Sequence, residues 1–347
     1  MAKEMRFNRI GVVVLCTIGA LVLIGLLYRS SGGYDDETIK ISELLSAAIY
    51  LAEAGGKRVV EVRAMDNDKI GQLTKGVTKE GKGEYVTYGD RKSHEIVVSG
   101  LKAGWPNLPY QSEEVDRTLV DTSLPPRFNS EVMAAAKRDE EVPIKAVTVW
   151  IDPLDATQEY TEGEKEPDLL KYVTVMLCIA VNGEPIAGVI HQPYDNDGNP
   201  NSGVTKWAWV GHGVSRTLQA AVSAKRSDHK TVRVITSRSH PGKVVSIAKE
   251  AFKDSVKVVE GIEAAGAGYK SLAVVEKNAD LYLHTTVIKK WDICAGNAIL
   301  SATGGKMTTR KGEKIDYSLK GDPQNSDGLV VAATEHEHAE YLEMLKI

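Results

Sequence analysis

Apolar and polar positions follow two patterns along most of the chain, one with the spacing of an α-helix and one typical of β-strands. Between Glu37 and Ala54, apolar side chains recur at helical spacing and stop at Gly55-Gly56, which predicts an amphipathic helix ended by glycine. A second helical pattern starts near Asp90, where a carboxylate suits a helix cap. The first part of the chain therefore contributes two helices.

Strand patterns follow these helices. Pro109–Glu114 is a short strand that ends on two acids, and Asp116–Pro143 is a polar segment typical of a surface insertion. Asn182-Gly183 separates two apolar runs, which predicts a tight antiparallel hairpin. The strands expected in this half are Ala146–Ile151, Tyr172–Val181, Pro185–His191 and Thr205–Val210.

From Thr231 onward, short apolar strands alternate with helical segments, which indicates an α/β arrangement. The expected strands are Val232–Thr236, Val256–Val259, Leu281–His284 and Leu329–Ala333, and the expected helices are Lys243–Phe252, Gly268–Glu276, Asp292–Ala302 and His336–Leu345. The change of pattern places a boundary near Ala224–Lys230. The sequence therefore predicts an α+β subdomain over 37–229 and an α/β subdomain over 230–347.

One apolar run ends abruptly in polar side chains. Ala146–Ile151 gives way to Asp152, Pro153 and Asp155, so acids are expected at the carboxyl end of a buried strand. Pro153 stiffens the turn after Asp152. Two converging carboxylates repel each other unless a cation lies between them, and hard oxygen ligands suit Mg²⁺. The alternative is a solvated turn in which Asp155 and Thr157 only cap the next segment.

Three polar loops follow predicted strands in the second half, at the transitions where α/β sheets usually bind ligands. These loops are Ser237–His240, Gly266–Lys270 and Trp291-Asp292. Taken singly, each is weak evidence, because glycines often end loops and a lone histidine is usually a surface or cap residue.

Composition and charge narrow the classes of function. The chain has 347 residues, 42% apolar and 26% charged, which is ordinary for a folded protein of two subdomains. The net charge of −4 and the lack of a long basic run argue against a nucleic-acid polymer as partner. Cys16, Cys178 and Cys294 lack metal-ligand spacing, so we expect free buried thiols, with a Cys178–Cys294 bond as the alternative.

Nineteen uncharged residues, Ile10–Tyr28, form an apolar run. As a helix it spans about 28 Å, against about 30 Å of membrane hydrocarbon. Basic residues precede it and acids follow it, so we expect a transmembrane anchor, with 1–9 cytoplasmic, 29–36 as a linker and the remainder lumenal or extracellular. A cleaved signal peptide is the alternative, although the run exceeds a usual h-region and no clear cleavage site precedes Ser30.

Three separated acidic motifs occur in order along the chain: Ser112-Glu113-Glu114, Trp150–Asp155 with Thr157, and Trp291–Gly296. Together they resemble the Mg²⁺-dependent, lithium-inhibited superfamily of inositol monophosphatases, bisphosphate nucleotidases and fructose 1,6-bisphosphatases. The resemblance covers Glu37 to the C-terminus, and a spaced set of motifs is far more specific than one motif. It implies a layered αβαβα sandwich preceded by one transmembrane helix.

Further motifs narrow the resemblance within this superfamily. The sequences at 155–160, 237–240 and 266–270 are similar to those of the 3′-phosphoadenosine 5′-phosphate (PAP) phosphatases, and the apolar N-terminus resembles that of their Golgi-resident members. The resemblance implies a hydrolase that converts PAP, the by-product of sulfotransferases, to AMP and phosphate in the Golgi lumen. It implies attachment to the Golgi membrane through the N-terminal helix, and it allows a homodimer.

The resemblance also assigns site residues. The implied Mg²⁺ ligands are Asp90, Glu113, Asp152, the main-chain carbonyl of Leu154, Asp155 and Asp292. The residues implied to activate water are Asp90 and Thr157, and those implied to bind substrate are Asp155, Thr157, Ser237, His240, Gly266, Lys270 and Asp292.

Ala156 departs from the superfamily, most of whose members carry glycine there, but it resembles the Golgi-resident form. Two alternatives stay open. An inositol phosphate phosphatase would use the same metals, although the loops Ser237–His240 and Gly266–Lys270 favour a nucleotide. A membrane-anchored pseudoenzyme would bind nucleotide without turnover, but every implied ligand position carries a competent residue.

Overall fold

The computed structural model describes residues 37–65, 71, 73–77, 83–115, 118–200, 203–223, 230–238, 241–255 and 258–345. The predicted cytoplasmic tail (1–9), membrane anchor (10–28) and linker (29–36) lie outside these ranges. Within the described ranges, every helix is too short or too polar to cross a bilayer. The predicted subdomain boundary coincides with the gap at 224–229, so the division at 229/230 stays a prediction.

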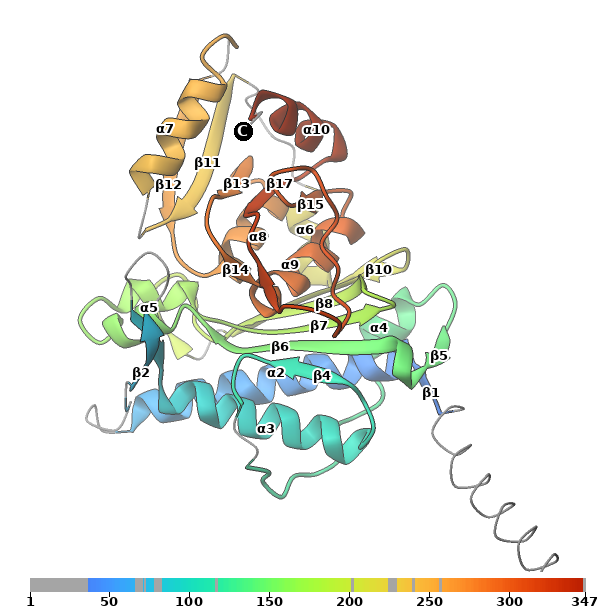
Figure 1. The fold of residues 1–347 in the computed structure, drawn as a ribbon. Helices are drawn as coiled ribbons and strands as arrows, with labels where there is room; N and C mark the ends of the chain where they lie inside the picture. Colours follow the sequence, from blue (N-terminus) through green and yellow to red (C-terminus); the bar gives the residue numbers. More distant parts are fainter. Residues whose placement is uncertain are drawn as a thin grey trace, which may run out of the picture.

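The larger sheet comes from the first half of the chain (Figure 1). Its strand order is β10-β9-β8-β7-β6-β4, and neighbours are antiparallel except for the parallel pair β4 and β6. The predicted hairpin of β7 and β8 is confirmed. The strands are β4 (Tyr110–Ser112), β6 (Val147–Asp155), β7 (Thr174–Val181), β8 (Glu184–Gln192), β9 (Val204–Trp209) and β10 (Gly213–Val214).

The smaller sheet has the order β12-β11-β13-β17-β15. β11 is parallel to β12 and β13, whereas β17 is antiparallel to β13 and β15. The strands are β11 (Thr231–Ser237), β12 (Val258–Ala264), β13 (Leu281–His284), β15 (Lys306–Thr308) and β17 (Leu329–Ala332). The sequence pattern did not predict β15. β12 extends well beyond the predicted Val256–Val259, because this edge strand is mostly exposed and lacks an apolar pattern.

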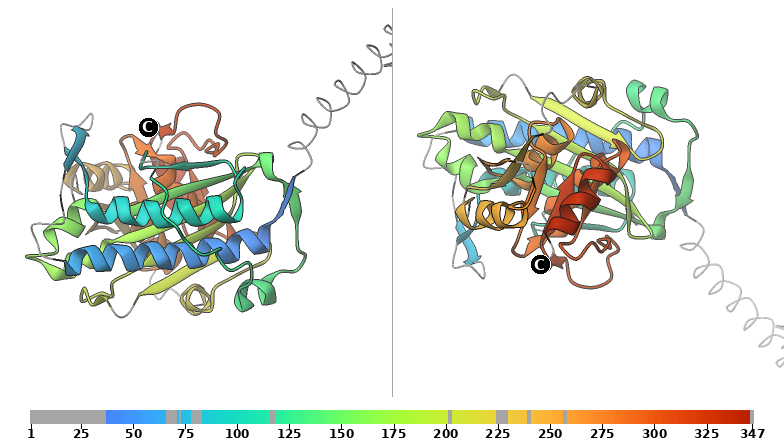
Figure 2. Two further views of the ribbon diagram at one scale, coloured as in Figure 1. Left: turned by 90° about the horizontal axis from the view of Figure 1, so that it is seen from below. Right: turned by 90° about the horizontal axis from the view of Figure 1, so that it is seen from above.

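Three pairs of helices complete the layers (Figures 1 and 2). The outer face of the larger sheet packs on α2 (Ile41–Ala64) and α3 (Tyr88–Gly104), and the outer face of the smaller sheet packs on α7 (Pro241–Ala251) and α10 (Glu335–Met344). Between the sheets lie α8 (Ala267–Val275) and α9 (Lys290–Ala302). The order of layers is αβαβα, as the resemblance implies.

Shorter elements connect these layers. They are β1 (Thr38–Lys40), β2 (Leu73–Val77), β3 (Gly83–Val86), α4 (Ser130–Ala135), β5 (Glu141–Pro143), η2 (Ile144–Ala146), α5 (Thr157–Glu162), η3 (Pro167–Tyr172), α6 (Arg216–Val222), β14 (Ile288–Lys289) and β16 (Gln324–Asn325). The predicted surface insertion therefore contains α4 and β5, and β5 pairs with β1.

Gly55-Gly56 does not end the first helix, because α2 continues to Ala64. A Cβ atom on Gly55 would lie 2.6 Å from Ser93 Oγ in α3, and one on Gly56 would lie 2.3 Å from His191 Cδ2 in β8. The two glycines therefore allow α2 to pack closely against its neighbours. A single sequence does not distinguish this use of glycine from a helix stop.

The predicted turn after Asp152 is a bulge inside a strand. β6 continues to Asp155, and a step of three residues from Asp152 to Asp155 faces a step of two from Met176 to Thr174 on β7. Pro153 lies at this point and has no N–H to donate to the sheet. The bulge places both acids at the carboxyl end of β6 without ending the strand.

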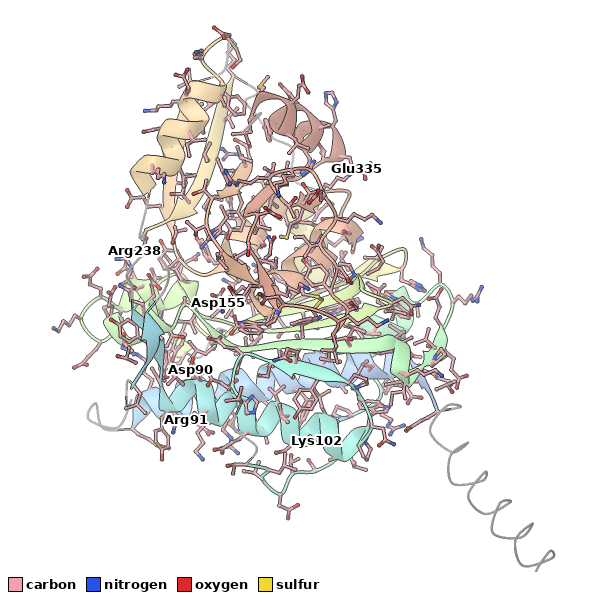
Figure 3. The ribbon with its side chains drawn as sticks, viewed as in Figure 1. Asp90, Arg91, Lys102, Asp155, Arg238 and Glu335 are labelled. Atoms are coloured by element: carbon pink, nitrogen blue, oxygen red, sulfur yellow. A yellow bond between two sulfur atoms is a disulfide. The ribbon has the colours of Figure 1, made fainter. Side chains whose placement is uncertain are left out.

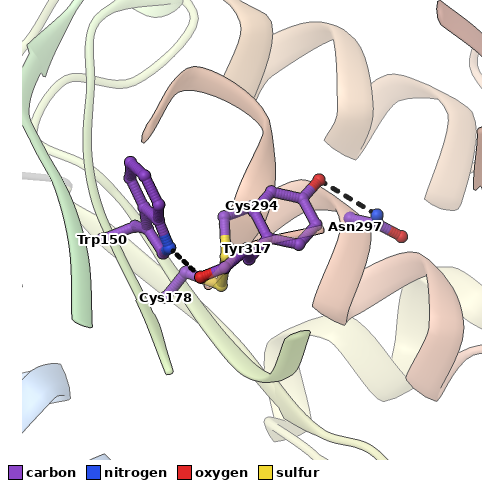
Figure 4. The surroundings of a disulfide bond; sticks show 5 residues. All are labelled: Trp150, Cys178, Cys294, Asn297 and Tyr317. Carbon is purple, nitrogen blue, oxygen red and sulfur yellow. Dashed lines mark hydrogen bonds between the residues drawn. A yellow bond between two sulfur atoms is a disulfide. The ribbon is translucent and has the colours of Figure 1, made fainter. Parts of the chain in front are cut away.

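The expectation of free thiols is wrong for Cys178 and Cys294. They form a disulfide between β7 and α9, with Cα atoms 5.6 Å apart (Figure 4). The two cysteines are 116 residues apart in sequence and meet because α9 packs across β7. Beside them, Trp150 Nε1 donates to the Tyr317 carbonyl at 2.8 Å. The disulfide therefore ties α9 to the larger sheet. Cys16 lies outside the described residues.

Removing the disulfide should weaken this attachment. We expect the double variant C178A/C294A to have a free energy of unfolding about 2–4 kcal/mol below that of the wild type. The disulfide closes a long loop and so limits the conformations of the unfolded chain, and the variant loses this restriction. Urea denaturation followed by tryptophan fluorescence measures the difference. Equal unfolding free energies for the oxidised wild type and the variant would contradict a stabilising disulfide.

Ala156 follows β6 and has a φ angle of +66° at the N-cap of α5. The left-handed region costs a residue with a Cβ atom about 1–2 kcal/mol, and the glycine that the resemblance implies at this position would avoid that cost. The backbone is held in this shape on both sides, since Ala156 N–H donates to Asp155 Oδ1 and the Ala156 carbonyl accepts from Tyr160 N–H.

Replacing Ala156 with glycine should relieve this backbone strain. We expect A156G to raise the free energy of unfolding by about 1 kcal/mol. Ala48→Gly in the buried face of α2 is the control, and it should lower stability by about 1 kcal/mol or more, because glycine is unfavourable inside a helix. Thermal unfolding midpoints measure both changes in stability, a rise for A156G and a fall for the control. A loss of stability in both variants would contradict the strain at Ala156.

Candidate active site

Carboxylates from three separate segments converge at one end of the larger sheet. Glu113 follows β4, Asp152 lies in β6 and Asp292 lies in the first turn of α9, and one oxygen of each lies within 4.8 Å of the others. The parallel pairing of β4 with β6 positions the first two, because Glu113 N–H donates to the Ile151 carbonyl at 3.1 Å. The sheet and α9 therefore form this acidic cluster together.

Burial and repulsion both act on the acidic cluster. Burial raises the pKa of Asp152 well above its usual range, and the charges of Glu113, Asp155, Asp292 and Asp90 raise it further. Burial likewise raises the pKa of Asp292 well above its usual range, with Glu113 and Asp155 adding to the effect. Buried carboxylates this close are costly unless a cation compensates them. The cluster therefore has the chemistry of a metal site.

Asp155 lies at the end of the bulge and contacts the second half of the chain. Its Oδ2 accepts from Gly268 N–H at 2.8 Å, in the first turn of α8. Gly266, the N-cap of α8, has a φ angle of +66°, and a Cβ atom there would lie 2.9 Å from Asp155 Oδ2. Both backbone conformation and space therefore require glycine at 266. Burial raises the pKa of Asp155, while the charge of Lys270 opposes this shift.

Asp90 and Thr157 form a hydrogen-bonded pair beside the cluster. The Thr157 hydroxyl lies 3.0 Å from Asp90 Oδ1 and 3.2 Å from the Leu154 carbonyl, so either oxygen can accept its proton. Asp90 Oδ2 accepts from the backbone N–H of Thr87 at 2.7 Å in the capping box of α3. Asp90 is thus a helix-capping residue and a neighbour of the acidic cluster at once.

Lys270 brings a positive charge to the same place. Its side chain is buried, with an exposed fraction of 4%, and its Nζ lies 5.4 Å from the centroid of the Tyr282 ring. Burial lowers the pKa of Lys270, and the carboxylates of Asp155, Glu159 and Asp292 raise it. The ammonium group therefore lies among carboxylates at the first turn of α8.

The structure places most of the residues that the sequence singles out around one point. Glu113, Asp152 and Asp292 form the acidic cluster, and Asp90 and Asp155 lie close enough for their charges to act on Asp152. Figure 3 labels Asp90 on α3 and Asp155 at the end of β6, near α5. Leu154, Thr157, Gly266 and Lys270 adjoin these carboxylates. Ser237 is the last residue of β11, and His240 lies outside the described residues.

Sequence reasoning assigned no role to Glu159 and Arg238, which meet beside this point. Arg238 Nη1 donates to Glu159 Oε1 at 3.1 Å and to Glu162 Oε2 at 3.3 Å. Both residues belong to motifs that support the family resemblance. Their pairing across 79 positions requires the fold, because nothing in a single sequence connects an arginine after β11 with a helix after β6.

Known proteins resemble this chain over most of its length. The model of the inositol monophosphatase family matches residues 40–346. Inositol monophosphatase 3 of Danio rerio is 40% identical over 94% of this chain and 92% of its own length. The Golgi-resident adenosine 3′,5′-bisphosphate 3′-phosphatase of Rattus norvegicus is 41% identical, covering 90% of this chain and 83% of its own length.

A solved structure shows the same fold. The crystal structure of CysQ from Bacteroides thetaiotaomicron, a bacterial member of the inositol monophosphatase family, superposes with a TM-score of 0.58 at 23% identity, over 85% of this chain and 99% of that one. The matched length, the identity to both curated relatives and the shared fold lead to one conclusion. This chain belongs to the inositol monophosphatase family and is a phosphatase.

Proposed function

We propose that this phosphatase uses Mg²⁺ to hydrolyse the 3′-phosphate of adenosine 3′,5′-bisphosphate (PAP), giving AMP and phosphate. The observation that carries the proposal is the acidic cluster of Glu113, Asp152 and Asp292 beside the pair Asp90–Thr157. The name of the Rattus norvegicus relative, an adenosine 3′,5′-bisphosphate 3′-phosphatase, supports this choice of substrate. The sequences of the loops Ser237–His240 and Gly266–Lys270 support it independently.

The donor set of the site fits Mg²⁺. Its side-chain donors are carboxylates, hard ligands that this ion prefers. Burial and mutual repulsion raise the pKa values of Asp152 and Asp292, and a bound cation would offset both effects. The proposed ligands are Asp90, Glu113, Asp152, the carbonyl of Leu154, Asp155 and Asp292. When bound, Mg²⁺ supplies charge neutralisation for the phosphoryl group and the leaving oxygen.

The residues of the chain provide the remaining parts of the reaction. Thr157 orients a water molecule, and Asp90 accepts a proton from that water through the hydrogen bond that joins the two side chains. Lys270 holds an anionic group of the substrate by its charge. Ser237, His240 and Gly266 contribute to the binding of the nucleotide. The water oxygen attacks the phosphorus, and the bond to the 3′-oxygen breaks with its electron pair left on that oxygen. The 3′-oxygen takes up a proton from solvent, so phosphate and AMP leave.

A second candidate substrate is an inositol phosphate. The relative from Danio rerio carries the name of an inositol monophosphatase and is as similar to this chain as the nucleotidase is. The same acidic cluster would serve both substrates, because each is a phosphate monoester. The two candidates differ in the group that the loops after β11 and β12 must bind.

We place the enzyme in the Golgi membrane as a single-pass protein with a cytoplasmic N-terminus and a lumenal catalytic domain. Three observations support this location: the apolar run at 10–28, the name of the Rattus norvegicus relative and the Cys178–Cys294 disulfide. Disulfides persist in oxidising compartments such as the secretory pathway. There the enzyme would clear the PAP that sulfotransferases leave, with a homodimer as a further expectation from the resemblance.

The choice of substrate is tested by phosphate release from the purified full-length protein in detergent. PAP, inositol 1-phosphate and 5′-AMP are compared at one Mg²⁺ concentration, with and without Li⁺. We expect release from PAP that Li⁺ inhibits, and none from 5′-AMP. Preference for inositol 1-phosphate would contradict the proposal in favour of the second candidate, and lack of release from every ester would favour a pseudoenzyme.

Replacing Asp152 with asparagine tests the metal site. We expect D152N to reduce kcat by about 10²-fold or more, because Mg²⁺ loses a direct ligand. Mutation of residues that only hydrogen-bond to metal ligands already lowers metal affinity or activity by about 10–100-fold. Since burial and repulsion raise the folded-state pKa of Asp152, ionised Asp152 destabilises the metal-free protein. We therefore expect metal-free D152N to be more stable than the wild type at pH 7.

The pH dependence of stability gives the sign of this effect. The metal-free wild type should lose stability as pH rises above about 4, the value for an unfolded aspartate, and D152N should lose less. Asp316→Asn is the control, because hydrogen bonds from Ser318 lower the pKa of Asp316 and its loss should not stabilise the protein. Thermal unfolding in the presence of a chelator measures all three proteins. A D152N variant that is less stable than the wild type at pH 7 would contradict uncompensated repulsion.

A further inference from the structure

Arg238 joins the smaller sheet to α5, and Figure 3 labels it where these two parts of the chain meet. Its backbone N–H donates to the Ala264 carbonyl at 2.9 Å, which anchors the residue between the ends of β11 and β12. Its guanidinium contacts two carboxylates that differ in exposure. The side chain of Glu159 is 10% exposed, whereas that of Glu162 is 38% exposed. Water screens the charge of Glu162, so Glu159 is the carboxylate whose charge depends on Arg238.

The charges of two cations act on Glu159. Burial raises its pKa, and the charges of Arg238 and Lys270 oppose that shift. Lys270 in turn responds to Asp155, Glu159 and Asp292, so it has carboxylates of the candidate active site and also Glu159 as neighbours. Charges act strongly on one another at buried positions, because the effective dielectric constant is low there.

The balance of these charges decides what Lys270 can bind. An ammonium group among carboxylates that lack other partners is already neutralised, and it attracts an additional anion weakly. Arg238 compensates the negative charge of Glu159 through a direct hydrogen bond. Lys270 therefore does not have to compensate that charge and retains its attraction for another anion. We propose that Arg238 is a positioning residue that acts through Glu159 to keep Lys270 available for a phosphate group of the substrate.

This inference rests on the proposed function only in taking an anionic phosphate ester as substrate. It differs from two simpler roles for Arg238. In the first, the guanidinium itself contacts the substrate phosphate. In the second, the ion pair between Arg238 and Glu159 only holds α5 in place. The three roles differ in whether loss of the Glu159 charge reverses the defect of an Arg238 variant, and a double-mutant experiment tests this.

The experiment uses full-length R238Q, E159Q and the double variant E159Q/R238Q. KM and kcat for PAP are measured, and binding of inorganic phosphate in the presence of Mg²⁺ is measured by calorimetry. We expect R238Q to raise KM and the dissociation constant of phosphate about tenfold with kcat within about threefold, and E159Q/R238Q to return both within about threefold of the wild type. E159Q alone should resemble the wild type.

A matched control removes a different arginine–glutamate pair. Arg216 pairs with Glu131, and its side chain is 85% exposed, so R216Q should leave KM, kcat and phosphate binding unchanged. A defect in R238Q that the double variant retains would overturn the inference in favour of direct contact with substrate. A defect in E159Q equal to that in R238Q would overturn it in favour of a purely structural pair.

The outcome is separable from that of the proposed function. If the wild type releases no phosphate from PAP, the choice of substrate fails. Calorimetry with inorganic phosphate still tests the charge of Lys270 in the same variants, because that probe carries no nucleotide. Equal phosphate affinity in the wild type and R238Q would overturn the inference whichever ester the enzyme hydrolyses.

Discussion

Repulsion between buried carboxylates is the constraint on which the rest of this structure depends. One oxygen each of Glu113, Asp152 and Asp292 lies within 4.8 Å of the others, and burial, with repulsion added, raises the pKa of the two aspartates. Nothing in their mutual interaction favours the arrangement, so the surrounding fold must impose it. Parallel pairing of β4 with β6 holds two of the acids, and packing of α9 on the larger sheet brings the third.

Several features of the fold serve this arrangement. The bulge at Pro153 lets β6 carry both Asp152 and Asp155 at its carboxyl end. The Cys178–Cys294 disulfide lies two residues beyond Asp292 in α9 and ties that helix to β7. A helix held covalently at this point resists the displacement that repulsion favours. The disulfide therefore helps to hold Asp292 of α9 close to Asp152 of β6.

The two halves of the chain also meet at the site through hydrogen bonds. Gly268 N–H in α8 donates to Asp155, and Arg238 donates to Glu159. Each contact joins the segment that follows β6 to the smaller sheet or its helices. A displacement of the first turn of α8, which bears Lys270, would therefore alter the hydrogen bond to Asp155. Conversely, the charge of Asp292 in the acidic cluster acts on Lys270.

Local patterns predicted the elements that depend on local physics. The hairpin of β7 and β8 and the helices from α7 to α10 follow from turn chemistry and periodicity, with ends within about two residues. The sequence did not predict the continuation of α2 through Gly55-Gly56, the strand β15 or the disulfide, because each depends on a partner distant in sequence. The acidic cluster was predictable from spaced motifs, whereas the pair Arg238–Glu159 required the fold.

Proton release on Mg²⁺ binding tests the central claim most directly. Calorimetric titrations of Mg²⁺ into the protein, repeated in buffers of different ionisation enthalpy, give the number of protons released. If the acidic cluster holds the ion, binding between pH 5 and 7 should release protons, because burial and repulsion raise the pKa values of Asp152 and Asp292 and a bound cation lowers them. D152N should release fewer. Binding of Mg²⁺ without proton release at any pH in this range would contradict the claim that these buried carboxylates form the metal site.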